Sequence, residues 1–298
     1  MNVGLLDVDG KLANLALMKL ARHHRDRGDE VDWYMPLGLY DKVYVSKLFN
    51  FSRIPEYVMN NVEIGGTGYD VKKKLPDEIE ALEPDYSIYN NLPYSLMLFS
   101  RGCIRKCPFC VVNEKEGLIR PIEAPQLNPG GQWIEVLDNN FFANPRWKAA
   151  IECLIEIGQP CNFHGIDVRI ITEEQAHYLK RLKIGGQNNS TWSKAGNKQK
   201  FTNKQIKIAW DRYQDKDKVL AGLKNMLKYL SPHKIMCYVL IGFDSTPEQD
   251  MERIQYLDEL KIDPFVMAYD RKDPYQHRFQ RWVNMKAIFK TVAWSDYK

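Results

Sequence analysis

The chain has 298 residues, of which 44% are hydrophobic and 27% are charged, so it is long and apolar enough to bury a globular core. The formal net charge of +4 is too small to indicate a polyanionic partner by itself. No apolar stretch reaches membrane-spanning length, and residues 1–7 lack the basic segment of a secretory signal. These observations disfavour a membrane protein and predict a cytoplasmic location.

Residues 1–93 are predicted to form a small Rossmann-like α/β domain. Apolar runs predict short strands at 3–8, 31–35, 42–45 and 62–64, with a helix over 12–25. Strands that alternate with helices indicate a parallel sheet. The glycine-rich stretch 65–68 is interpreted as a tight turn, or as a place where a ligand approaches the backbone. Asp7 and Asp9, after the first strand, are helix-capping residues or ligand groups.

Residues 94–270 show a second pattern, in which six strands are separated by long connections. The strands are predicted at 95–100, 133–137, 161–170, 206–210, 235–241 and 264–268, and helices at 145–157, 173–182, 216–230 and 247–260. Repeated strand–helix units of this length predict a partial (β/α)6 parallel barrel. Such a barrel gathers its ligand groups at the carboxyl ends of the strands.

Two segments depart from this pattern. Residues 183–205 carry five lysines and no acidic residue, which indicates a solvated loop or a contact with nucleic acid or another polyanion. Residues 271–298 are predicted to be a basic and aromatic helical extension. Its aromatic face is interpreted as packing on the core, with binding of single-stranded nucleic acid as the alternative.

The cysteines fall into two groups. Cys153, Cys161 and Cys237 are scattered among apolar residues and are predicted to be buried structural thiols, which disfavours a second cluster. The other three form one short motif.

Cys103, Cys107 and Cys110 stand at Cys-x-x-x-Cys-x-x-Cys spacing, directly after the first strand of the second pattern. Three thiolates on one loop can bind three irons of a [4Fe–4S] cluster and leave the fourth iron open to a ligand. A closed zinc site would need a fourth ligand, and none lies nearby in the sequence.

This motif, with an aromatic residue just before its third cysteine, resembles the signature of the radical S-adenosylmethionine (SAM) enzyme superfamily. The resemblance covers residues 94–270 and extends to uncharacterised bacterial and phage members, so it implies no substrate. It implies that the three cysteines bind one [4Fe–4S] cluster and that SAM chelates the open iron. One electron from an external donor such as flavodoxin or ferredoxin would cleave SAM to methionine and a 5′-deoxyadenosyl radical. The radical would abstract hydrogen from an unknown substrate, which includes nucleotides and nucleic acids as candidates.

The resemblance also implies a cofactor pocket. Phe109 would line the adenine. Asp138 or Asn139 would accept a hydrogen bond from the SAM amino group, although Asp138-Asn139-Asn140 departs from the Gly-Gly-Glu of many members. Ile241 and Gly242 correspond to an adenine-binding segment.

Two further pocket residues follow the third strand. By the resemblance, Arg169 would pair with the methionine carboxylate and Asp167 would reach the ribose hydroxyls, with a plain ion pair as the alternative. Candidates for facing the substrate lie at strand ends: Trp210, Asp211 and Tyr269. His164 also lies near a strand end, where a lone histidine is interpreted as structural.

Residues 1–93 resemble the cobalamin-binding domain that precedes the barrel in one branch of the superfamily. The Asp-x-His-x-x-Gly motif that ligates cobalt is absent, because residues 7–11 read Asp-Val-Asp-Gly-Lys. A degenerate domain without cobalamin is therefore expected. Two other hypotheses remain open: a non-catalytic iron–sulfur protein that senses redox state or binds nucleic acid, and a cobalamin-dependent radical methyltransferase.

Overall fold

The computed structural model describes residues 1–10, 13–58, 61–186 and 204–297. The chain is a mixed α/β protein with parallel sheets, as the sequence predicts. It divides into two compact units, which are residues 1–134 and, from Glu135 onward, the described part of the remainder. Most of the basic segment predicted at 183–205 lies outside the described residues.

Unit 1 begins with a four-stranded parallel sheet in the order β2-β1-β3-β4. Its strands are β1 (Asn2–Asp7), β2 (Glu30–Trp33), β3 (Lys42–Ser46) and β4 (Val62–Gly65). Helix α1 (Leu15–Arg25) connects β1 to β2 and buries Leu17 and Met18. The side chain of Asn14 caps this helix by accepting hydrogen bonds from the first-turn amides.

The loops at the carboxyl edge of this sheet hold one another in place. Asp9 accepts hydrogen bonds from the amides of Leu48 and Phe49 and from the hydroxyl of Ser52. Asp7 accepts from the amide of Gly10 at 3.2 Å. Both carboxylates therefore shape the turns after β1 and β3. The helix-capping interpretation is wrong for these two residues, because the cap of α1 is Asn14.

The rest of unit 1 consists of short elements. They are α2 (Asp77–Glu80), a 3-10 turn (Tyr86–Ile88), β5 (Tyr94–Met97), β6 (Ser100–Arg101), α3 (Val112–Glu116) and β7 (Arg120–Pro121). The strand predicted at 95–100 is thus divided between β5 and β6. Strand β8 (Trp133–Val136) lies where unit 1 passes into unit 2, and it joins a three-stranded sheet in the order β5-β8-β9.

Unit 2 alternates strands and helices. The elements are α4 (Trp147–Ile157), β9 (Cys161–Phe163), α5 (Glu173–Arg181), β10 (Ile206–Trp210), α6 (Lys216–Leu227), β11 (Ile235–Ile241), α7 (Pro247–Glu259), β12 (Asp263–Ala268), α8 (Pro274–Asn284) and α9 (Lys286–Thr291). Short 3-10 turns lie at Phe141–Ala143, Val168–Ile170, Tyr213–Asp215 and Pro232–Lys234.

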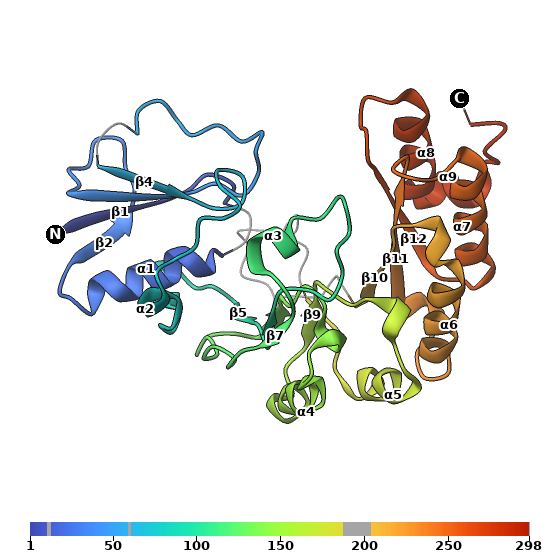
Figure 1. Cartoon of the computed structure of the whole chain (residues 1–298), viewed down its shortest axis with the longest axis horizontal. Helices are drawn as coiled ribbons and strands as arrows, with labels where there is room; N and C mark the ends of the chain where they lie inside the picture. Colours follow the sequence, from blue (N-terminus) through green and yellow to red (C-terminus); the bar gives the residue numbers. More distant parts are fainter. Residues whose placement is uncertain (11–12, 59–60, 187–203, 298) are drawn as a thin grey trace. The chain divides into compact units, whose positions relative to one another are not determined.

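The second parallel sheet of unit 2, in the order β10-β11-β12, has two unlike faces. Ile208 and Val239 are buried on one face. Helix α7 packs against β11 and β12 of this sheet (Figure 1). On the opposite face, Lys207 and Tyr238 are half-buried and Phe265 is 38% exposed. The alternation follows from the two-residue period of a strand.

Strand β12 is covered along its edge by α8. The Asn284 side chain accepts a hydrogen bond from the Val266 amide and donates one to the Val266 carbonyl. Phe279 and Trp282 on α8 are buried and pack around Trp294. The aromatic face of residues 271–298 thus belongs to the core, which was the first of its two interpretations.

One predicted strand is wrong in extent. A strand was expected over 161–170, but β9 ends at Phe163, and Val168–Ile170 forms a 3-10 turn. The physical reason is local, because the Asp167 side chain caps the turn by accepting from the Arg169 amide at 3.1 Å. Asp167 and Arg169 therefore lie in a connection and not at a strand end.

No closed barrel is shown among the described strands. None of the described helices combines the length and the apolar character needed to span a bilayer.

Candidate functional site

The cysteine loop is shaped by the residues on either side of it. Gly102 has φ +81°, and a Cβ atom there would overlap the backbone carbonyl of Leu118, so the start of the loop requires glycine. The Cys103 amide donates to the Gly117 carbonyl at 3.2 Å, which closes the loop. Strands β6 and β7 pair antiparallel on each side of it.

Two charged side chains brace the same loop. Glu116 accepts a hydrogen bond from the Gly102 amide at 2.8 Å and pairs with Arg101 at 3.1 Å. The Lys115 ammonium on α3 donates to the hydroxyl of Thr67 at 2.6 Å. Thr67 lies in the glycine-rich turn after β4, so this turn contacts the helix that follows the cysteines.

None of the three loop cysteines forms a disulfide within the described residues. Cys103 and Cys107 are half-buried and Cys110 is exposed. The Cys110 amide donates to the Cys107 carbonyl at 3.0 Å, and the Arg105 amide lies 3.4 Å from the Cys103 sulfur.

The donor set suits an iron–sulfur cluster, because three thiolates on a single loop are its usual ligands. In the described ranges, no three side chains of His, Cys, Asp or Glu are already gathered as a metal-binding group. The chemistry of the loop therefore fits the cluster, and its sulfur atoms are not preassembled. Phe109 is half-buried within the same loop.

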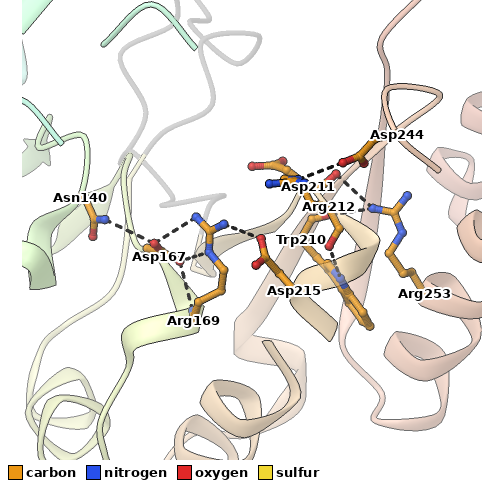
Figure 2. Close-up of polar contacts among 9 residues, drawn as sticks. All are labelled: Asn140, Asp167, Arg169, Trp210, Asp211, Arg212, Asp215, Asp244 and Arg253. Carbon is orange, nitrogen blue, oxygen red and sulfur yellow. Dashed lines mark hydrogen bonds and ion pairs between the residues drawn. The ribbon is translucent and has the colours of Figure 1, made fainter. Parts of the chain in front are cut away.

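A polar network joins the connections that follow β8, β9 and β10 in unit 2 (Figure 2). The Arg169 guanidinium donates to both oxygens of Asp167, at 2.7 and 3.1 Å, and to Asp215 at 2.7 Å. Burial opposes the charge of Arg169, but the bonds to Asp167 and Asp215 raise the pKa of the guanidinium above its usual value. Arg169 thus forms an ion-pair network, which was the alternative to a carboxylate-binding role.

The segment after β8 lies beside this network. The Asn140 amide donates to Asp167 at 3.4 Å, and the Phe141 amide donates to the Gly165 carbonyl at 2.9 Å. Asp138 is 1% exposed, whereas Asn139 is half-buried. Asp138 and Asn139 precede Asn140 in this segment, and the contact with Asp167 is made by Asn140.

Trp210, the last residue of β10, and Asp211, the residue after it, lie in different surroundings. Trp210 is 1% exposed and its indole donates to the Arg212 carbonyl at 3.1 Å, so its ring is part of the core. Asp211 is half-buried, and burial raises the pKa of its carboxyl to about 6. A carboxyl with such a pKa can exchange protons near neutral pH.

The end of β11 is crowded by α8. Ile241 is buried, and Gly242 has φ +75°. A Cβ atom at Gly242 would overlap the side-chain amide of Gln276, so the space beside this glycine is filled by the protein itself. Tyr269 is 57% exposed, and its ring packs edge-on against Phe243 at 5.1 Å.

The sequence interpretation missed a cluster built around Glu135. This carboxylate is buried on β8, and the His164 imidazole contacts it at 2.6 Å. His164 is therefore not a lone histidine. The available signal was a charged residue inside the apolar strand Trp133-Ile134-Glu135-Val136, where an unpaired carboxylate would be costly.

The cysteine loop and Phe109 belong to unit 1, and the other predicted site residues belong to unit 2. Comparison of the chain with protein-family models gives no match, and comparison with curated protein sequences gives none either.

Proposed function

We propose that this protein is a radical SAM enzyme in which Cys103, Cys107 and Cys110 hold one [4Fe–4S] cluster. The observation that carries the proposal is the spacing of three cysteines, none of them in a disulfide within the described residues, in one braced loop after β5. When bound, the cluster supplies the one-electron chemistry that cleaves SAM. The residues proposed to border the bound SAM are Asp138, Asn139, Asp167 and Arg169, and Asp211 would hold or release a proton.

The proposal includes a partial (β/α)6 barrel. Strands β5, β8 and β9 follow one another in one sheet, and β10, β11 and β12 in another, in the order of the chain. The Lys207 ammonium of β10 donates to the Asn162 side chain of β9 at 3.3 Å, which links the neighbouring edges of the two sheets. This order of strands supports the proposed barrel.

Anaerobic reconstitution of the full chain with iron and sulfide tests the proposal. The wild type is expected to become brown, to bind about four irons, and to form 5′-deoxyadenosine with SAM and a strong reductant. A variant with all three loop cysteines replaced by Ser should bind no cluster. The matched control is Cys153→Ser, outside the loop, which should keep it. Equal iron in the loop variant and the wild type would refute the assignment of ligands.

A non-catalytic iron–sulfur protein is the second candidate. Two observations favour it: Arg169 is engaged by two carboxylates, and Gln276 fills the space beside Gly242. The same experiment separates the candidates. A reconstituted cluster that leaves SAM intact would support the second candidate, and formation of 5′-deoxyadenosine would exclude it.

A further inference from the structure

Four side chains, three on β8, β9 and β10 and one directly after β9, form a continuous polar chain in unit 2. One oxygen of Glu135 contacts the His164 Nε2 and the Asn162 side-chain amide, each at 2.6 Å. The Asn162 carbonyl oxygen accepts from the Lys207 ammonium at 3.3 Å. Only 4% of the Glu135 side chain is exposed, so its charge is compensated by these neighbours and not by water.

The contact with Glu135 fixes the role of each nitrogen of His164. A carboxylate only accepts hydrogen bonds, so Nε2 carries the proton and donates it. The lone pair of a neutral imidazole is then on Nδ1. Among the described residues, Nδ1 has no hydrogen-bond partner, and the side chain is 33% exposed. An imidazole held by a buried carboxylate, with its other nitrogen open, is the arrangement of an oriented general base.

An aromatic pair shares a sheet face with Lys207. Lys207 belongs to the same face of the β10-β11-β12 sheet as Tyr238 and Phe265. The two rings pack edge-on with centroids 5.3 Å apart, and Phe265 is 38% exposed. Burial lowers the pKa of the Lys207 amine, an effect that the charge of Glu135 reduces. A flat ligand can pack on the two rings while its polar edge meets Lys207 and His164.

We propose that Glu135, Asn162, His164 and Lys207 form a proton-transfer site for a small molecule that carries an acidic O–H or N–H on a planar ring. His164 Nδ1 takes the proton: the O–H or N–H bond of the ligand breaks, an N–H bond forms on the imidazole, and the electron pair stays on the ligand. Glu135 stabilises the imidazolium, and Lys207 donates a hydrogen bond to the ligand anion. The site does not depend on the proposed function, because it contains no residue of the cysteine loop.

The test uses 4-nitrophenol as the probe, since it is a planar ring with an acidic O–H whose anion is yellow. Full-length protein is titrated into the probe at a pH below the pKa of the free phenol. Cations within a few ångströms shift the pKa of an acid down by about one unit or more, so the bound probe should show roughly tenfold more phenolate than the free probe. The readout is the visible spectrum and requires no cluster.

Three variants and one control complete the test. His164→Gln and Glu135→Gln should lose the phenolate signal, and Lys207→Met should reduce it. The control is His277→Gln, an exposed histidine on α8, which should retain the full signal. Circular dichroism is used to check that each variant is folded. The proposal is overturned if the wild type produces no extra phenolate, or if the folded His164→Gln variant produces as much as the wild type.

Discussion

Replacement of Arg253 by Met is expected to destabilise unit 2 more than any exposed ion-pair substitution. Arg253 and Asp250 are both 0% exposed and lie 2.6 Å apart on α7. The guanidinium also donates to the Trp210 carbonyl at 2.9 Å and to the Ser245 hydroxyl at 3.1 Å. The side chain thus ties α7 to the end of β10 (Figure 2).

The size of the effect follows from the groups that Met would leave unpaired. Asp250 would keep hydrogen bonds from the Ser245 and Tyr275 hydroxyls, at 2.6 and 3.2 Å, but would lose the cation that pairs with it. Removal of one partner from a buried ion pair costs about 3–5 kcal/mol in the free energy of unfolding. For a protein of this size, such a loss lowers Tm by on the order of 10 °C.

The assay is thermal and urea unfolding of the full chain. The matched control is Lys148→Met, which breaks the Lys148–Glu174 pair, whose side chains are 53% and 55% exposed. Exposed pairs contribute little, so this control should unfold almost as the wild type does. The double variant Arg253→Met/Asp250→Asn should recover part of the loss, because no buried charge remains. A decrease in Tm for Arg253→Met no larger than that of Lys148→Met would refute the reasoning.

Two further predictions concern the ends of β10 and β11. Burial raises the pKa of Asp211 to about 6, so the fold favours the protonated carboxyl, and this contribution to stability is lost as the pH rises through about 6. In the wild type, this effect lowers the free energy of unfolding by at most about 3 kcal/mol between about pH 4 and 7, and Asp211→Asn should remove that decrease. Urea unfolding at both pH values measures it, and the same decrease in the variant would contradict the assignment. Gly242→Ala should destabilise the protein more than Gly158→Ala, whose φ of +69° is similar but whose Cβ would have no neighbour closer than 3.8 Å. Equal losses of stability in the two variants would show that the Gln276 side chain moves aside at no cost in free energy.

The sequence predicted the elements of the fold well where one local pattern decides the structure. The alternation of Ile206, Ile208 and Trp210 predicted β10, and all three are buried on one face. Helix α7 begins at Pro247 after a capping box formed by Thr246. These signals involve neighbours in the chain, so periodicity and capping chemistry are sufficient to read them.

The polar contacts were harder to predict, because they join residues far apart in the sequence. Arg169 pairs with Asp215, which lies 46 residues away, and His164 pairs with Glu135, 29 residues away. The sequence placed Arg169 near the end of a strand but did not show that carboxylates already surround it. For the same reason, it could not show that the side chain of Gln276 occupies the space that Gly242 leaves open.

The contrast between the exposed Cys110 and the buried Cys161 and Cys237 has a practical consequence for thiol chemistry. The prediction of burial is wrong for Cys153, which is half-buried at the surface of α4. Burial raises the pKa of the Cys161 thiol to about 12 and raises that of Cys237 further, and both are 0% exposed. Alkylating reagents act on exposed thiolates, so these two residues should react only when unit 2 unfolds, whereas Cys110 is exposed in the native chain. Mass-spectrometric mapping of alkylated cysteines therefore reports two events in one sample: occupancy of the loop by metal, and opening of the core of unit 2.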